Sequence, residues 1–430
     1  MAIYESSVIR HGGCKLWIAK ESGGKALYVS GEGEAYDLLN GELSAGGKRC
    51  ALTNANAEII RRLFPFTRPV SREGHDFTVG LGDRLGLASP GHIRLVKDML
   101  AKGIKIFPVL AQQSMRELNL TGRTYDDVLA AAVWAVFQEG YKGGYGADGD
   151  HLKTHGEVQT ALDAGFSMIT LDCSEHIKSD AAGLGDPAAI YAGAVGHIID
   201  IYNNLLKGRG VDVEVSVDET AFSTSPEAHY YIAGELVKAG VEFVSLAPRF
   251  CGEFQKGIDY RGEVGEFTRE FKAHAEIARE LGYKLSVHSG SDKFKVFPAI
   301  YKQTGRAVHL KTAGTSWLEA LRVIARKRAE LFREIYKFAV GNAREAQKYY
   351  VISADTANMP DIGGMGGGEL EQLLEQDDAR QVLHITYGLI LTAENNGAPV
   401  YKDKLYAALH ECEDDYYNAL IKHLGRHIEV

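Results

Sequence analysis

The feature that most constrains the fold is a repeated alternation of β-type and helical segments between residue 77 and about residue 340. Each short run rich in Val, Ile, Leu and Phe ends in polar residues and is followed by an amphipathic stretch. Several of these stretches end at a Gly just before the next run. Gly adopts the left-handed conformation of a helix C-cap at low cost, so these positions indicate helix ends. The alternation is typical of βαβ units and a parallel sheet.

Eight such strand–helix cycles follow one another, and eight is the number that closes a barrel. Their strand segments are FTVGLGDRLG (77–86), IKIFPVLAQQS (104–114), YGADGDHLKT (145–154), FSMITLDCSEH (166–176), VDVEVSVDET (211–220), VEFVSLAPRF (241–250), YKLSVHSGSDK (283–293) and RAVHLKTAGTS (306–316). An open doubly wound sheet is the alternative, but no G-x-G-x-x-G follows the first strand. We therefore predict an α/β fold, a (β/α)8 TIM barrel over residues 76–340.

The segments on either side of the barrel have a different character. Residues 1–75 form a predicted N-terminal extension, with strands in KLWIAK and ALYVSG and a helix in NANAEIIRRLF. Residues 341–430 form a predicted helical C-terminal appendage packed on the barrel. Its Gly-rich stretch MPDIGGMGGGE (359–369) indicates a loop or the hinge of a lid.

Composition and charge exclude several classes of protein. The 430 residues carry a formal net charge of -9 and contain no Lys/Arg-rich block, which argues against a nucleic-acid-binding surface. The five cysteines are scattered and form no C-x-x-C pair, as expected for free thiols in a reducing compartment. Neither a signal peptide nor a long apolar run is present, so we expect a cytoplasmic protein without a membrane partner. The oligomeric state, including a homo-oligomer, stays open.

The strand ends are expected to carry the chemistry, because barrel enzymes place their active sites at the carboxyl ends of the strands. Strand residues alternate between the barrel interior and its helix-facing exterior. Since the Val, Ile and Leu positions face outward, the polar positions between them face inward. The predicted rim therefore gathers His151, Lys153, Asp172, Asp218 or Glu219, Arg249, His288, His309 and Lys311.

Imidazoles and carboxylates on separate strands suit a borderline divalent ion such as Zn2+, Mn2+, Ni2+ or Co2+. We predict Glu219, His288 and His309 as the metal ligands. Asp218 is the alternative to Glu219, because a bulge at the strand end would exchange the two. The competing interpretation is that these His residues donate hydrogen bonds inside a packed barrel and bind no ion.

Basic and small polar residues near the same strand ends predict an anionic substrate. Lys and Arg side chains would hold a carboxylate or phosphate, and N–H groups of the SGSDK loop (289–293) would assist. Ion pairs with Asp172 and Asp292 are the alternative use of these cations. The motif HLKT, at 151–154 and 309–312, would place the same chemistry at two strand ends. The predicted substrate-binding residues are His151, Lys153, Arg249, Ser289, Ser291 and Lys293.

Three longer stretches resemble the bacterial tagaturonate epimerase family: YGADGDHLKTHGE (145–157), HSGSDKFKVFPAIYKQTG (288–305) and VHLKTAGTSWLEALRVIA (308–325). The similarity runs from about residue 75 to the C-terminus. It implies a divalent-metal enzyme that interconverts D-tagaturonate and D-fructuronate in hexuronate catabolism. The resemblance also implies a weaker activity on the uncharged ketoses fructose and tagatose.

The inverted carbon of such a substrate is β to the ketone, so its C–H is not acidic and simple deprotonation cannot invert it. Transient oxidation would need a nicotinamide-binding loop, and none is visible in the sequence. Retro-aldol cleavage remains: a metal or a Lys stabilises the enediolate, the aldehyde half rotates, and the bond re-forms on its other face. We predict Asp172 as an acid/base with Asp218 as a second catalytic carboxylate. Lys311 or Lys153 is the electrostatic partner, and Lys311 as a Schiff-base nucleophile is the alternative.

Two other functions stay open at this stage. A ketose-phosphate aldolase or a sugar isomerase on the same barrel would share the metal or Lys site, but an aldolase would release the two halves. A non-catalytic sugar-binding or partner subunit is the second alternative. The many ionisable residues predicted at one rim argue against it, because burying each unpaired would cost several kcal/mol.

Overall fold

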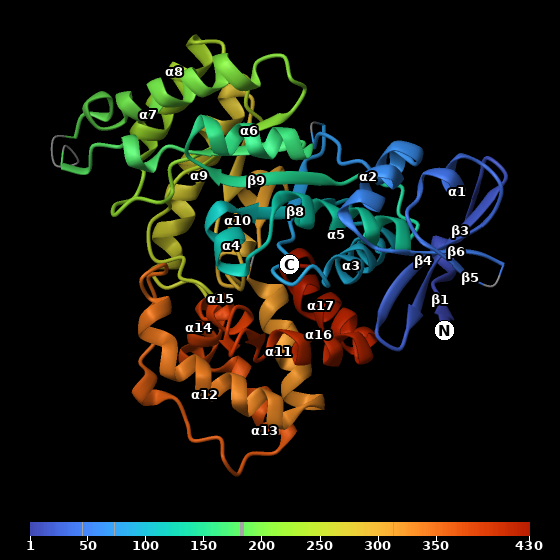
Figure 1. Cartoon of the computed structure of the whole chain (residues 1–430). Helices are drawn as coiled ribbons and strands as arrows, with labels where there is room; N and C mark the ends of the chain where they lie inside the picture. Colours follow the sequence, from blue (N-terminus) through green and yellow to red (C-terminus); the bar gives the residue numbers. More distant parts are fainter. Residues whose placement is uncertain (45, 73, 181–184, 313) are drawn as a thin grey trace.

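The computed structural model describes residues 1–44, 46–72, 74–180, 185–312 and 314–430. Its centre is a closed barrel of parallel strands in which each strand pairs with its sequence neighbours and the last pairs with the first (Figure 1). This confirms the predicted (β/α)8 fold. The barrel strands are β7 (Phe77–Gly80), β8 (Phe107–Ser114), β9 (Gly146–Leu152), β10 (Met168–Asp172), β11 (Asp212–Ser216), β12 (Ser245–Ala247), β13 (Lys284–Val287) and β14 (Val308–Lys311).

Helices cover the outside of the barrel and bury its apolar outward residues, such as Ile169 and Val215, completely. Local signals explain their ends: α6 begins with a capping box between Thr154 and Glu157 and ends at Gly165 in the left-handed conformation. Gly282 and Gly305 end α9 and α10 in the same way, as the sequence predicted. The surrounding helices are α3 (Ser89–Ala101), α4 (Met115–Thr121), α5 (Tyr125–Gln138), α6 (His155–Ala164), α7 (Pro187–Ile201), α8 (Pro226–Lys238), α9 (Val264–Leu281), α10 (Phe297–Thr304) and α11 (Thr315–Lys327).

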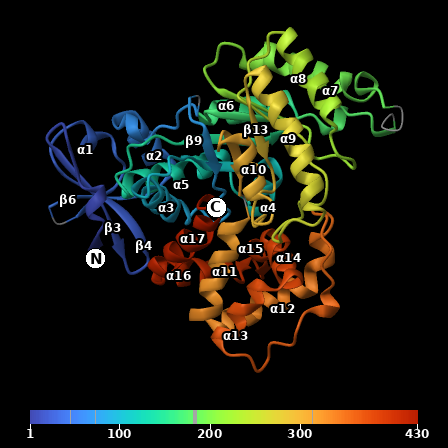
Figure 2. The same cartoon turned by 180° about the vertical axis from the view of Figure 1, so that it is seen from behind.

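The N-terminal segment forms an antiparallel sheet that lies beside the barrel (Figures 1 and 2). Both strands and the helix expected there are present. Arg72, in the connection to the barrel, is completely buried and pairs with Glu214 at 3.1 Å. It thereby closes the end of the barrel opposite the strand carboxyl ends. The elements are β1 (Ala2–Ile3), β2 (Ile9–His11), β3 (Cys14–Glu21), β4 (Gly24–Gly31), α1 (Glu34–Leu38), β5 (Glu42–Ser44), β6 (Gly47–Ala51) and α2 (Asn54–Leu63).

The C-terminal segment is helical and packs below the barrel in the view of Figure 1. The helical pattern of residues 317–338 is divided into two helices at Arg328, whose φ and ψ of -142° and 59° are not helical. Residues 348–355, which follow the long helix, are mostly irregular and reach the mouth of the barrel. The helices are α12 (Ala329–Ala346), α13 (Gly367–Gln372), α14 (Asp377–Ile385), α15 (Tyr387–Leu391), α16 (Lys402–Glu411) and α17 (Glu413–Ile428).

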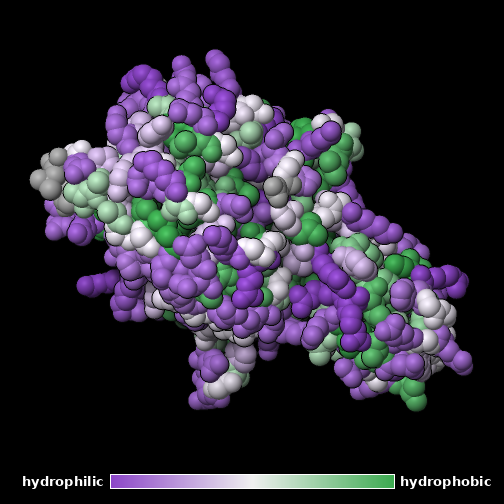
Figure 3. Space-filling model, turned by 90° about the horizontal axis from the view of Figure 1, so that it is seen from above, coloured by the Kyte–Doolittle hydropathy of each residue, from purple (hydrophilic) through white to green (hydrophobic). Residues whose placement is uncertain are grey.

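Hydrophilic residues dominate the face of the molecule shown in Figure 3, with smaller hydrophobic areas between them. Within the described part of the chain, no helix is both long and apolar enough to span a membrane.

Candidate active site

A cavity of about 720 Å³ opens at the carboxyl ends of the barrel strands, where the sequence predicted the site. Its wall combines strand ends, the loops that follow them and the C-terminal segment. Among the lining residues are Gln112, Arg116, Asp150, His151, Lys153, Asp172, Asp218, Glu219, Arg249, Lys256, His288, Ser289, Ser291, Lys311, Tyr350 and His384.

The register of the strands decides which inward residues reach this cavity. Ser286 of β13 lies opposite His309 of β14, so His288, two residues further on, is level with Lys311. His309 is therefore one layer deeper in the barrel, because inward residues of a barrel stack in layers.

His309 is a correction to the predicted ligand set. It is completely buried and does not line the cavity, and its Nδ1 lies 2.7 Å from the hydroxyl of Thr78. Burial lowers the pKa of His309 well below its ordinary value, with Arg72 adding to the effect. The structure thus does not bring His309 together with Glu219 and His288. The two HLKT motifs also differ, since the first places its His at the cavity and the second does not.

Lys311 is the centre of a buried charge cluster at the floor of the cavity. Its Nζ lies 2.9 Å from Asp148, 2.6 Å from Asp150 and 2.8 Å from Glu214. Burial alone would lower the pKa of Lys311, but these carboxylates outweigh it and raise the pKa above its ordinary value. Lys311 is therefore an ammonium in the folded protein, which does not favour it as a Schiff-base nucleophile.

A bulge at the end of β9 brings more acid into the cavity than strict alternation predicts. The pairing with β10 shifts register between Ile169 and Leu171, and His151 has a φ of 52°, in the left-handed region. Two residues of the bulged strand then share one side. As a result Asp150 and His151 both line the cavity. Strict alternation from His151 and Lys153 would place Asp150 on the outside, so the bulge adds a carboxylate to the cavity.

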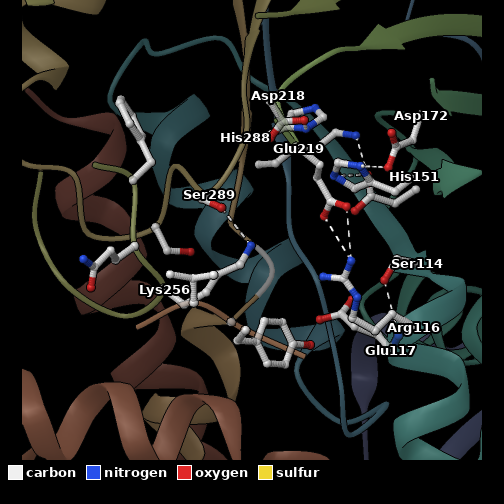
Figure 4. A pocket seen from close by; sticks show the side chains of 18 of the residues that line it. Ser114, Arg116, Glu117, His151, Asp172, Asp218, Glu219, Lys256, His288 and Ser289 are labelled. Atoms are coloured by element: carbon white, nitrogen blue, oxygen red, sulfur yellow. Dashed lines mark hydrogen bonds and ion pairs between the residues drawn. The ribbon is translucent and has the colours of Figure 1, made fainter. Parts of the chain in front are cut away.

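His151, Asp218 and His288 are the described residues that best form a candidate metal site (Figure 4). One ligand atom from each lies within 4.8 Å of the others. His288 is fixed between two carboxylates, with Nδ1 at 3.1 Å from Asp218 and Nε2 at 2.8 Å from Glu214. Burial favours the neutral acid, but the rings of His288 and His151 outweigh it and lower the pKa of Asp218.

The donor set fits a divalent ion. Two imidazoles and a carboxylate are typical ligands of borderline metals. The buried Nδ1 of His151 and Oδ2 of Asp172 also lack a hydrogen-bond partner, although they lie 3.4 Å apart as an ion pair. Carboxylates gather at this end of the cavity: Asp150, Asp172, Asp218 and Glu219 line it, and Asp148 and Glu214 lie beneath its floor against Lys311.

Glu219 lies on the other side of His151. It forms a second candidate group with His151 and Asp172, but both its carboxylate oxygens accept from Arg116 at 3.2 Å. The structure thus places Asp218 beside His288 and Glu219 beside Asp172.

Asp172 points into the barrel as predicted, and it is held ionised. Its Oδ1 accepts a hydrogen bond from the N–H of Ser174, and Lys153 lies 3.7 Å from Oδ2. Burial would raise its pKa, but the adjacent His151 outweighs this and lowers the pKa of Asp172 to about 2. Burial would likewise lower the pKa of His151, but Asp150, Asp172 and the other acids raise it to about 10.

The predicted anion-binding residues separate into two groups. Lys153, Arg249, Ser289 and Ser291 line the cavity, but Lys293 does not. The ammonium of Lys293 is buried and donates to the main-chain carbonyls of Gln255, Ile258 and Ser291. Its expected contact with substrate was wrong, because these three carbonyls use the three donors of a Lys.

Two N–H groups of the SGSDK loop are in use. Gly290 donates to the carbonyl of Lys311 and Asp292 donates to His427. Asp292 itself is buried against Arg380 and His423, at 2.7 Å and 2.5 Å. This loop is therefore held by the C-terminal helices through Asp292, while Ser289 and Ser291 line the cavity.

Several cavity residues were missed by reasoning from the sequence. Gln112 is nearly completely buried, and neither atom of its side-chain amide has a hydrogen-bond partner. Its amide lies over Gly80 of the neighbouring strand β7, where an added Cβ would come within 1.9 Å of the amide oxygen. Lys256, Tyr350 and His384 come from long loops and the C-terminal segment. Only the inward position of Gln112 on its strand carried a signal in the sequence.

Comparison with known proteins shows the family to which the chain belongs. The sequence profile of the tagaturonate epimerase family matches residues 4–189 and 179–430. A curated tagaturonate/fructuronate epimerase of Thermotoga maritima is 39% identical over an alignment 475 positions long, covering 100% of this chain and 96% of that protein. The chain belongs to the tagaturonate epimerase family. It is therefore an enzyme of the isomerase class, an epimerase.

Solved structures of another tagaturonate epimerase family member have the same fold throughout. A glycerol complex of the fructuronate-tagaturonate epimerase of Cohnella laeviribosi is 41% identical, with a TM-score of 0.96 over 100% of this chain and 96% of that chain. Its native crystal structure has the same identity and TM-score, over 99% and 96%. The N-terminal sheet and the C-terminal helices are thus part of the family architecture.

Proposed function

We propose that this epimerase interconverts D-tagaturonate and D-fructuronate in hexuronate catabolism, and that it does so by metal-assisted retro-aldol cleavage. The observation that carries the proposal is the joining of His151, Asp218 and His288 beside the carboxylate of Asp172, in one cavity at the strand ends. Membership of the family and the names of the two relatives support the choice of substrates.

His151, Asp218 and His288 would hold a divalent ion such as Zn2+, Mn2+, Ni2+ or Co2+, with Glu219 as a further candidate ligand. When bound, such an ion supplies Lewis acidity to the ketone oxygen and the adjacent hydroxyl of the substrate. Glu214 orients the ring of His288 through its Nε2, which is the role that outer carboxylates play around metal-binding His residues.

Asp172 would act on the hydroxyl of the inverted carbon. As an ionised base it takes the hydroxyl proton, the C–C bond toward the ketone breaks, and the bond electrons form the enediolate. The aldehyde half rotates, the C–C bond re-forms on its other face, and Asp172 returns the proton to the new hydroxyl. His151 and Lys153, next to the carboxylate, stabilise its ionised form before the proton arrives.

Lys311 would stabilise the negative charge that develops on the enediolate. Its ammonium is fixed by the carboxylates of Asp148, Asp150 and Glu214, so it does not need to reorient during the reaction. Arg249 remains our predicted contact for the substrate carboxylate, because it lines the cavity and has no carboxylate partner among the described residues. A weaker side activity on fructose and tagatose is part of the proposal, since the reacting groups are the same in these neutral sugars.

The test is to incubate the purified protein with D-fructuronate in D2O and to follow the products by NMR. We expect D-tagaturonate whose inverted carbon retains its hydrogen, because retro-aldol cleavage never breaks that C–H bond. Deuterium at the inverted carbon would refute the mechanism. Net accumulation of the two cleaved halves would identify an aldolase, and absence of turnover would refute the proposed substrates.

A further inference from the structure

Lys256 is a cavity cation that, like Arg249, has no carboxylate partner among the described residues, and the proposed mechanism does not use it. It lies in the loop between β12 and α9, and its Nζ donates to the hydroxyl of Ser289 at 2.7 Å. Within the described part of the chain, no carboxylate lies at ion-pair distance from it. Arg84 and Arg116, by contrast, pair with Glu117 at 2.8 Å and Glu219 at 3.2 Å.

The main chain around Lys256 is held on two sides. Lys293 donates to the carbonyls of Gln255 and Ile258, at 2.9 Å and 2.6 Å. From the C-terminal helix α14, Arg380 donates to the carbonyl of Gly257 at 2.6 Å. A charged side chain on so fixed a loop is preorganised for a ligand, which reduces the entropy lost on binding.

Ser289 fixes the other end of the contact. It follows the candidate ligand His288 directly, and its φ of 50° is unusual for a residue other than Gly. Such strain is tolerated where the surrounding structure over-determines it, and it is frequent at ligand sites. In Figure 4 the Lys256–Ser289 pair lies across the cavity from Asp172 and His151. The cavity therefore has an acidic end that suits a cation and a separate basic group that suits an anion.

We infer that Lys256, held by Ser289, binds the carboxylate of the sugar acid and makes the cavity prefer acids over neutral ketoses. This inference rests on the proposed function for its substrates. Burial takes water from the ammonium of Lys256 and thereby lowers its pKa, with Glu219 and Glu117 opposing. A carboxylate placed beside it gains more than it would in water, because the attraction grows as the dielectric falls. Arg249 is the second cation, and its guanidinium already donates to the carbonyl of Thr220.

The test compares wild type with K256M, K256Q, K256R and R249M, and uses K302M on the exposed face of α10 as a matched control. We measure kcat/KM for D-fructuronate and for D-fructose. A lost charge-assisted hydrogen bond predicts that K256M and K256Q lower the value for the acid about 10- to 100-fold more than the value for fructose. K256R should recover part of the preference for D-fructuronate over D-fructose. R249M should reduce this preference less than K256M does, and K302M should leave it unchanged.

A second readout does not need turnover. Calorimetry with D-gluconate and D-glucitol, which differ in their carboxylate, should give a wild-type preference for gluconate that K256M and K256Q reduce about 10- to 100-fold. Equal weakening of both ligands, a larger shift in R249M, or no gluconate preference in the wild type would overturn the inference. Absence of fructuronate turnover with gluconate preference intact would instead refute the proposed function and leave Lys256 as an anion site. Thermal melting confirms that each variant is folded.

Discussion

Replacing Lys311 by Met removes the one cation that three buried carboxylates share. Lys311 is only 3% exposed, and its Nζ lies within 2.9 Å of Asp148, Asp150 and Glu214. Removing one partner from a buried ion pair costs about 3–5 kcal/mol, because the remaining charge is left uncompensated. We therefore expect K311M to lose about 3–5 kcal/mol of unfolding free energy, together with its activity.

The pH dependence of this loss has a defined sign. In wild type the pKa of Lys311 is raised above the value of about 10.4 that it has in the unfolded chain. Its contribution to the free energy of unfolding is therefore fully present below about pH 10.4 and is lost only as the pH rises through the pKa of the folded state. Between pH 5 and 8 Lys311 therefore stays charged in wild type, although burial raises the pKa of its partner Asp148 to about 6, so that this carboxyl loses its proton within the same range. In K311M at least one carboxylate keeps a proton that the unfolded chain releases near pH 4, so the stability of K311M falls as pH rises.

Urea denaturation of chelated protein at pH 5 and pH 8 measures both effects without a contribution from bound ions. Lys153→Met is the matched control. Its Nζ lies 3.1 Å from Glu175 and 3.7 Å from Asp172, with 28% of the side chain exposed, and such pairs are worth about 0–1 kcal/mol. A K311M loss as small as that of K153M, or one that does not change with pH, would refute the reasoning.

Three further predictions follow from the same geometry. His288→Asn should weaken metal binding by more than about 100-fold, because changes to residues that only orient a metal ligand already cost about 10–100-fold. His309→Asn should retain its bound metal, as measured by mass spectrometry. Equal loss of metal in both variants would contradict the assignment of the ligands. Asp172→Asn should lower kcat by about 10²–10⁴ with metal content intact, and an unchanged kcat would exclude it as the acid/base. Asp292→Asn leaves Arg380 unpaired and should cost about 3–5 kcal/mol in urea denaturation. Because the pKa of Asp292 is lowered, its contribution is present above about pH 4 and lost as pH falls, so the gap to wild type should narrow toward pH 3; a constant gap would contradict this.

Sequence periodicity was sufficient for the barrel and for most inward positions, because a strand buried on its outer face must alternate. Thr170 and Asp172 point inward for this reason, and so do Glu214 and Lys311. Periodicity could not show in which layer of the barrel interior each inward residue lies. Whether His309 or Lys311 is level with His288 depends on the register between β13 and β14, which no local pattern encodes.

Two other kinds of feature were beyond the sequence. The bulge at His151 breaks alternation, so the inward positions His151 and Lys153 gave no indication that Asp150 also faces the cavity. Lys293 and Lys256 show the second kind. Both are basic residues near the site. Lys293 donates its hydrogen bonds to main-chain carbonyls, whereas Lys256 lines the cavity, and this difference depends on how loops distant in the sequence pack together.

The measurement that tests the central claim most directly is metal content and fructuronate epimerisation in the same sample. The protein is chelated with EDTA, reconstituted stepwise with Mn2+, Zn2+, Ni2+ or Co2+, and assayed by mass spectrometry and NMR at each step. We predict that the rate falls on chelation and returns in proportion to bound metal, saturating at about one ion per chain. A full rate of tagaturonate formation in protein that holds no metal would contradict the account.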